Sequence, residues 1–205
     1  MRKFRRTMVV LAASVALLAL SACSGLSAFG EELNRKLEGV NATMTTYTQA
    51  GEVIDEVKGQ SFQVSRDTRF DTTDSEGASN QDSSVLMISL GDGHISHVGS
   101  TLIIAQEGVI DVTEALGSKV AFENAESGTP WLNNLLEYNQ NLWKGKAKTL
   151  MIRSQDGTPV AVYAGNAVEI FATDVPKSTT FRVDGKYVFV YRADYTVYDN
   201  ALLAK

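Results

Sequence analysis

Short runs of alternating apolar and polar residues follow one another along the chain from Thr43 onward, separated by Gly, Asp and Asn. An alternation with a period of two, broken by turn-forming residues, predicts β-strands. The first half of this pattern predicts strands over residues 44–48, 53–57, 61–70, 84–90, 94–98 and 101–106. The second half predicts strands over residues 149–154, 159–164, 167–171, 180–183, 187–192 and 196–198.

The segments between these runs predict hairpin turns. Gly91-Asp92-Gly93, Asp156-Gly157 and Asp184-Gly185 supply residues that tolerate the positive φ values of two-residue turns. Residues 71–83 are almost free of apolar side chains and contain the turn tetrad Asp74-Ser75-Glu76-Gly77. We therefore expect this segment to form the exposed tip of a hairpin.

Further patterns predict how the core is built. Residues 187–191 are apolar at every position, so this strand should be covered on both faces, on one of them by a helix. That helix is expected from Pro130 to about Trp143, because Thr129 can cap it and its apolar residues recur at helical spacing. One face of the last long hairpin should carry a core stripe of Phe181, Val183, Tyr187, Phe189 and Tyr191.

These patterns predict an α+β, mainly β fold class. Antiparallel hairpins should form a sandwich or a partly open barrel, with the one amphipathic helix packed on it. We see no internal repeat and no interdomain linker in the chain, so residues 40–205 are expected to form a single β-rich domain.

The N-terminus has the pattern of an export signal. Four basic residues, Arg2, Lys3, Arg5 and Arg6, precede an apolar run over residues 8–20. This run is shorter than the roughly 20 residues that a helix needs to cross a bilayer, so residues 1–22 are predicted to be a signal peptide. The arginine pair lacks the surroundings of a twin-arginine motif, which favours an ordinary secretory signal.

The residues that follow are Leu20-Ser21-Ala22-Cys23, which resemble the lipobox of bacterial lipoproteins. The resemblance implies that Cys23 becomes the diacylated first residue of the mature chain. Lasting anchorage needs about two acyl chains, and one diacylglycerol supplies both. The predicted location is therefore the extracytoplasmic face of the cell membrane, with the membrane itself as a partner through the lipid on Cys23.

Residues 23–39 should connect the lipid to the domain. Apolar residues recur there at helical spacing, at Leu26, Phe29, Leu33 and Leu37, and Gly39 would end the helix. This juxtamembrane segment could be a spacer, or it could be a first helix packed on the core.

Composition and charge narrow the possible functions. An apolar content of 44% is enough for a real core, and the single cysteine cannot form a disulfide within its own chain. Cleavage after residue 22 would leave 15 basic against 24 acidic side chains, a net charge of −9. An acidic body of this kind is repelled by anionic lipid and has no basic stripe for nucleic acid, so no nucleic-acid partner is expected.

Two metal sites can be considered. Asp92, His94 and His97 form the one histidine-bearing cluster of the sequence, but an offset of three puts the two histidines on opposite faces of a regular strand. The alternative is one solvent-facing and one half-buried histidine. Asp71, Asp74 and Glu76 could bind calcium, although their spacing departs from a calcium loop and a solvated hairpin tip explains them equally.

The sequence gives only weak evidence for a catalytic site or a ligand-binding site. No nucleophile elbow is present in the sequence, and pairs among the 24 acidic residues will occur by chance. Tyr195 and Tyr198, near the C-terminal end, are the tyrosines that belong least clearly to the core, and they are candidates for binding a cell-envelope glycan.

Three stretches of the chain resemble an uncharacterised family of Gram-positive lipoproteins, domain-of-unknown-function family 5052. They are residues 93–103, residues 154–165, and the segments 174–177, 183–186 and 191–193. The resemblance implies membrane attachment and an exported β-rich fold, and it implies no activity and no cofactor. We expect a non-catalytic binding or structural module that contacts a cell-envelope component or a partner protein. The alternative is an envelope-acting hydrolase with a carboxylate pair or a His/Asp centre.

Overall fold

The computed structural model describes residues 37–115 and 145–203, and β-strands make up most of this part of the chain. The predicted signal peptide, Cys23 and the predicted helix over residues 130–143 lie outside the described residues. The strands before that gap are β1 (Asn41–Tyr47), β2 (Val53–Gln60), β3 (Phe62–Arg66), β4 (Leu86–Leu90), β5 (Gly93–His97) and β6 (Thr101–Gln106). The strands after it are β7 (Lys148–Arg153), β8 (Pro159–Gly165), β9 (Val168–Ala172), β10 (Ser178–Val183), β11 (Lys186–Tyr191) and β12 (Asp194–Asp199).

The described residues also form three short helices: η1 (Thr68–Phe70) between β3 and β4, α3 (Val112–Ala115) after β6, and α6 (Asn200–Leu203) after β12. The twelve predicted strands are confirmed with ends that shift by a few residues, except that residues 68–70 of the strand predicted over 61–70 form the 3-10 helix η1. No helix among the described residues is long and apolar enough to cross a membrane.

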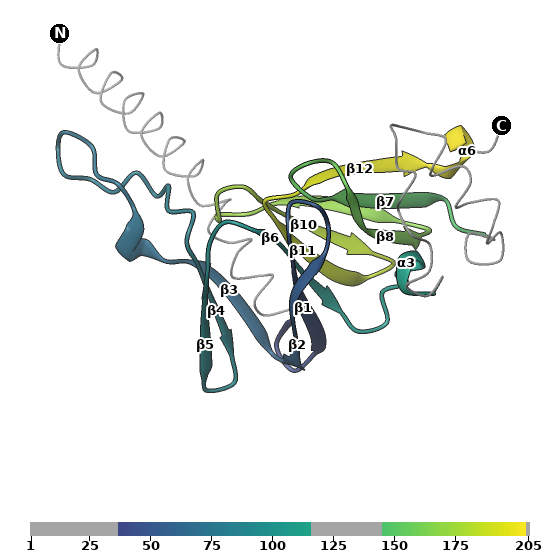
Figure 1. Ribbon diagram of the computed structural model, residues 1–205, viewed down its shortest axis with the longest axis horizontal. Helices are drawn as coiled ribbons and strands as arrows, with labels where there is room; N and C mark the ends of the chain where they lie inside the picture. Colours follow the sequence, from purple (N-terminus) through teal and green to yellow (C-terminus); the bar gives the residue numbers. More distant parts are fainter. Residues whose placement is uncertain (1–36, 116–144, 204–205) are drawn as a thin grey trace, which may run out of the picture.

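The strands form three antiparallel sheets (Figure 1). The largest has six strands in the order β2-β1-β6-β11-β10-β9, and the two smaller sheets have the orders β12-β7-β8 and β3-β4-β5. Because the described strands of the large sheet end at β2 and β9 without closing on each other, the fold is a mainly β sandwich and not a closed barrel.

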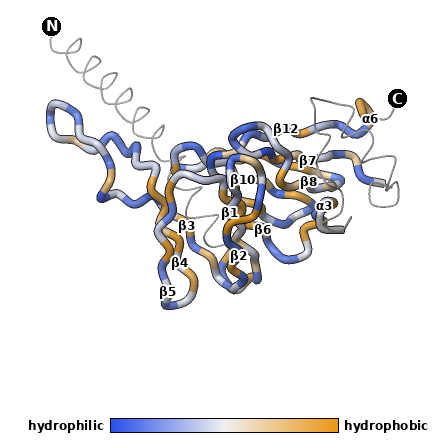
Figure 2. Tube along the Cα trace, in the orientation of Figure 1, coloured by the Kyte–Doolittle hydropathy of each residue, from blue (hydrophilic) through white to orange (hydrophobic). Residues whose placement is uncertain are grey.

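The two faces of the large sheet support two separate hydrophobic clusters. Cluster 1 joins one face to the β3-β4-β5 sheet and contains Phe62, Ile88 and Phe189. Cluster 2 joins the opposite face to the β7 and β8 strands and contains Ile152 and Phe181. Figure 2 shows that hydrophobic residues follow the strands while the segment between β3 and β4 is mostly hydrophilic.

Strand β11 lies at the centre of this arrangement and is buried on both faces, as its sequence predicts. Tyr187, Phe189 and Tyr191 belong to cluster 1, whereas Val188 and Val190 belong to cluster 2. Among the described residues, strands from the two smaller sheets cover these faces, and the predicted contribution of a helix lies outside the described part of the chain.

The predicted core stripe along this hairpin is wrong. The two-residue turn Asp184-Gly185 places Val183 opposite Lys186, and it therefore places Phe181 opposite Val188. Residues that lie opposite each other in an antiparallel pair share a face. Phe181 and Val183 consequently point into cluster 2, away from Tyr187, Phe189 and Tyr191.

The C-terminal end of the predicted juxtamembrane segment packs on the domain. Leu37 is only 1% exposed and belongs to cluster 1. Gly39 follows with a φ of +74°, a left-handed conformation that ends the helical turn as predicted.

Candidate functional site

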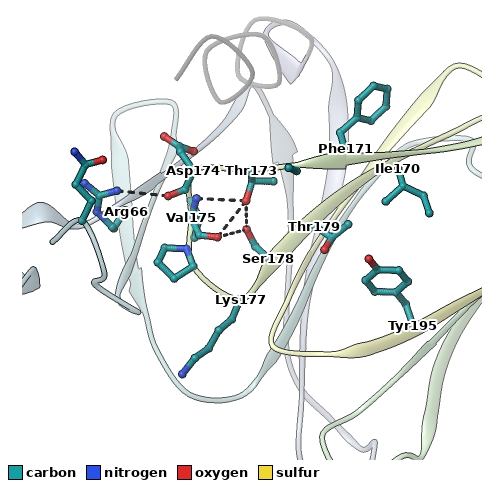
Figure 3. Close-up of a pocket in the computed structure, with 13 residues that line it drawn as sticks. Arg66, Ile170, Phe171, Thr173, Asp174, Val175, Lys177, Ser178, Thr179 and Tyr195 are labelled. Carbon is teal, nitrogen blue, oxygen red and sulfur yellow. Dashed lines mark hydrogen bonds between the residues drawn. The ribbon is translucent and has the colours of Figure 1, made fainter. Parts of the chain in front are cut away.

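A groove of about 740 Å³ lies beside the ends of β9 and β10 (Figure 3). Its lining residues come from β3, the segment between β3 and β4, β9, the loop between β9 and β10, β10 itself and β12. Both apolar and hydrogen-bonding side chains line it, among them Arg66, Ile170, Lys177, Thr179 and Tyr195. This volume falls within the range of sites that hold small ligands.

The loop between β9 and β10 is held in shape by its own hydrogen bonds. The Ser178 hydroxyl donates to the Val175 carbonyl at 2.8 Å, and the Thr173 hydroxyl donates to the same oxygen at 3.1 Å. The Val175 side chain is 4% exposed and inserts into cluster 1. Lys177 has a φ of +62°, and its carbonyl accepts a hydrogen bond from the Arg192 N–H at 2.9 Å. The loop therefore presents a fixed wall to the groove.

Tyr195 is the one predicted ligand-binding residue that reaches this groove. Its ring meets Phe181 edge to face, with 4.8 Å between ring centroids and an interplanar angle of 80°. The residue is 39% exposed, so part of the ring is open to a ligand.

Tyr198 points to the opposite side of β12, because an offset of three residues reverses the face of a strand. Its hydroxyl lies 3.2 Å from Arg153 Nη2, which donates a hydrogen bond to it. The structure therefore does not bring the two predicted tyrosines together.

Arg66 connects the groove to the segment between β3 and β4, which we call the arm (residues 67–85). Arg66 Nη1 donates to the Asp174 carbonyl at 3.4 Å, and Arg66 Nε lies 2.9 Å from Asp71 Oδ1 in an ion pair. Both side chains of this pair are largely buried, with 12% and 4% exposed. The N–H of Nε is not aligned for a hydrogen bond, so the contact is mainly electrostatic.

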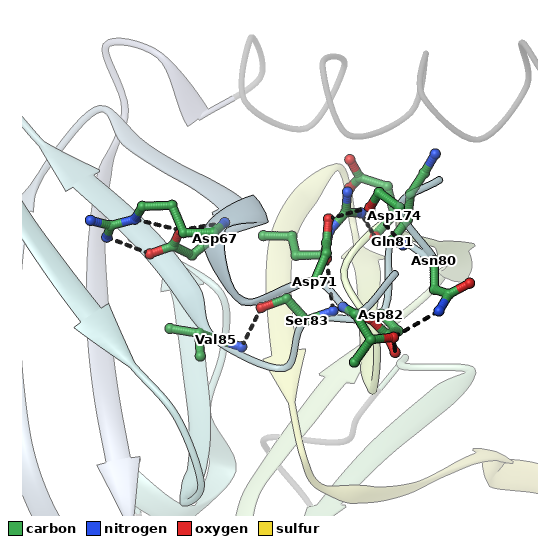
Figure 4. Close-up of polar contacts among 12 residues, drawn as sticks. Asp67, Asp71, Asn80, Gln81, Asp82, Ser83, Val85 and Asp174 are labelled. Carbon is green, nitrogen blue, oxygen red and sulfur yellow. Dashed lines mark hydrogen bonds and ion pairs between the residues drawn. The ribbon is translucent and has the colours of Figure 1, made fainter. Parts of the chain in front are cut away.

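Carboxylate side chains of the arm accept hydrogen bonds from other residues of the arm and so hold its shape (Figure 4). Asp71 accepts hydrogen bonds from the Ser83 N–H and the Ser79 hydroxyl, both at 2.9 Å. Burial alone would raise the pKa of Asp71, but these bonds and Arg66 hold that pKa below its usual value. Asp82 accepts from the Thr72 hydroxyl and N–H, which lowers its pKa as well.

The tip of the arm is the hairpin turn that the sequence predicts. Asp74 Oδ1 accepts from the Glu76 and Ala78 N–H groups, each at 2.9 Å, and Gly77 has a φ of +84°. Figure 1 shows the arm projecting away from the sheets. The oxygens of Asp71 and one oxygen of Asp74 already accept bonds from the arm itself, which disfavours a calcium loop. Asp74 and Glu76 belong to the exposed tip as predicted, but the Asp71 side chain is largely buried.

The candidate metal ligands lie apart. His94 is exposed, and its Nδ1 lies 3.1 Å from the Ser89 hydroxyl. His97 is half-buried on the other face, with Nε2 3.0 Å from the Ser100 carbonyl and its ring edge-on to Tyr191. Asp92 is exposed in the turn before β5. Within residues 37–115 and 145–203, no three His, Cys, Asp or Glu side chains are grouped so that they could hold a metal ion.

The carboxyl groups of the described residues are engaged mainly with internal donors. Arg182 lowers the pKa of Glu169, and Lys146 lowers the pKa of Asp184. The Arg69 side chain lowers the pKa of Asp67, and the Ser154 hydroxyl lowers that of Asp156. A glycosidase acid needs a carboxyl group whose pKa is raised, whereas the pKa of each of these four carboxyl groups is lowered.

Sequence reasoning missed most of the groove. Ile170, Thr179 and Arg66 occupy ordinary strand positions, and nothing in their local pattern marks them as neighbours of Tyr195. The segment 174–177 is one of the stretches that resemble the family, and it belongs to the loop that forms one wall of the groove.

Comparisons with known proteins place the chain in a family but give it no activity. Neither the curated proteins nor the solved structures include a match to it. One family model matches residues 5–203 and carries the description domain of unknown function (DUF5052). The protein belongs to this family.

Proposed function

We propose that this protein is a lipid-anchored module on the extracytoplasmic face of the cell membrane, and that it binds an envelope component or a partner protein without turning it over. The observation that carries the proposal is the sequence Leu20-Ser21-Ala22-Cys23 directly after a short apolar run with a basic N-terminal flank. A diacylglycerol on Cys23 would hold the protein at the membrane without a transmembrane helix.

The folded domain supports a binding role in two ways. The groove at Tyr195 joins an exposed aromatic ring to hydrogen-bonding side chains on a fixed loop, which is the usual composition of a ligand site. The described carboxyl groups with shifted pKa values are held in their charged form, which suits ion pairing better than general acid catalysis.

Labelling with a radioactive fatty acid tests the anchor. The wild-type protein should incorporate the label and remain with the membrane fraction. The Cys23→Ala variant should lose the label, whereas Ser27→Ala, a matched change close by, should keep it. An unlabelled wild type, or a labelled Cys23→Ala variant, would refute the proposal.

A further inference from the structure

We infer that the groove at Tyr195 binds a neutral polymer of N-acetylated amino sugars, with one sugar ring stacked on Tyr195. This inference rests on the proposed function, because it names the class of envelope component that the module would bind. Three properties of the groove carry it: an open aromatic ring beside an aliphatic wall, unpaired hydrogen-bonding groups, and balanced charge.

The exposure of Tyr195 contrasts with that of the other tyrosines near the same sheets. Tyr191 is fully buried and its hydroxyl donates to the Ser84 carbonyl at 2.5 Å, while the hydroxyl of Tyr198 is bonded to Arg153. The Tyr195 hydroxyl has no hydrogen-bond partner among the described residues. Phe181 fixes the ring, so a ligand that stacks on it would not have to immobilise it first.

An aliphatic surface adjoins this ring. Ile170 lies on the same face of the sheet as Phe181, because the two residues are paired across β9 and β10, and it is 51% exposed. Thr179 stands on this face as well, two residues before Phe181. The C–H face of a pyranose ring packs on an aromatic ring, and the methyl group of an acetamido substituent needs an apolar neighbour of this kind.

Hydrogen-bonding groups stand around the apolar surface. The Thr179 hydroxyl, the Gln81 amide and the Lys177 ammonium line the groove, and within the described part of the chain none of these side-chain groups has a partner. Figure 3 shows the Thr179 and Tyr195 side chains on the same side of the view, with the Lys177 side chain extending away from them. Hydroxyl and amide groups can donate to and accept from the ring hydroxyls and the amide of an N-acetylated sugar.

Charge favours a neutral ligand over an anionic polymer. Arg66 is paired with Asp71, and the exposed Lys177 is offset by the exposed Asp174 in the same loop. The groove therefore offers no excess of positive charge to phosphate or carboxylate groups.

Titration calorimetry with chitotetraose, a tetramer of N-acetylglucosamine, tests the inference on the full-length protein in detergent. The wild type should bind the tetramer saturably. Tyr195→Ala should weaken binding about tenfold or more, whereas Tyr198→Ala, the matched change on the other face of β12, should leave it within about twofold. Cellotetraose, which lacks the acetamido groups, should bind more weakly than chitotetraose.

A second variant guards against a folding defect, because Tyr195→Ala uncovers Phe181. Thr179→Val keeps the volume of the side chain and removes its hydroxyl, and it should also weaken binding. If the wild type does not bind chitotetraose, the inference is wrong. This result is expected if the groove accepts extended peptides instead. Equal effects of the two tyrosine variants, or equal affinity for cellotetraose, would overturn it too. Fatty-acid labelling of Cys23 is independent of these results, so a failure here is distinguishable from a failure of the anchor.

Discussion

Removing two methyl groups from Val188 tests whether the central sheet is covered on both faces. Val188 is fully buried in cluster 2, on the face of β11 opposite to Phe189. Each buried CH₂ group contributes about 0.8 kcal/mol, so the transfer term of Val188→Ala is about 1.6 kcal/mol. The cavity left in a packed cluster adds to this loss, which gives an expected destabilisation of about 2–3 kcal/mol.

The same substitution at an exposed position provides the control. Val53 begins the edge strand β2 and is 60% exposed, so Val53→Ala should change the free energy of unfolding by less than about 0.5 kcal/mol. Urea unfolding followed by far-UV circular dichroism measures both variants, and the m value should stay constant. If Val188→Ala costs as little as Val53→Ala, that face of β11 is open to solvent and the three-sheet arrangement is wrong.

Two further predictions concern the contacts of the arm. Tyr191→Phe removes the hydroxyl that donates to the Ser84 carbonyl, and it should cost about 1–2 kcal/mol in the same urea assay; an unchanged midpoint would show that this bond contributes nothing. The pKa of Asp71 and that of Asp82 are lowered in the folded protein, so their contribution to stability is present above the ordinary aspartate value of 3.8 and is lost as the pH falls through the folded values. Amide hydrogen exchange in residues 71–83 should therefore lose protection below about pH 4 before β11 does, and simultaneous loss in both would contradict this assignment.

Local chemistry determines the strands, and this is why the sequence predicts them well. Alternating residues and turn pairs such as Asp156-Gly157 act within a few positions, and the resulting hairpins appear at the expected places. The predicted assignment of residues 181–191 to one face of the hairpin is wrong, and the reason for this is also local. A two-residue turn pairs Val183 with Lys186, so residues with odd numbers on β10 share a face with residues with even numbers on β11.

The groove depends on contacts between residues far apart in sequence, which local patterns do not encode. Arg66 lies 108 positions from Asp174, yet a hydrogen bond joins the two residues. Tyr195 meets Phe181 because β12 belongs to a different sheet from β10, and no turn or periodicity specifies how those sheets pack. The sequence indicates that Tyr195 is a plausible ligand contact, but the partners of its ring follow only from the packing of the sheets.

Strands that are apolar at nearly every position show which features of a sheet a sequence pattern can predict and which it cannot. Residues 101–104 and 187–191 are buried on both faces, and their strands β6 and β11 pair at the centre of the large sheet. Strand β8 is just as thoroughly buried, yet it lies at the edge of its sheet. The segment before α3 explains the difference: Asp111 forms a bridge with Tyr163, and the fully buried Val112 packs beside it, which covers this edge. An unbroken apolar run therefore predicts that both faces of a strand are covered, but it does not predict whether a neighbouring strand or a loop protects its edge.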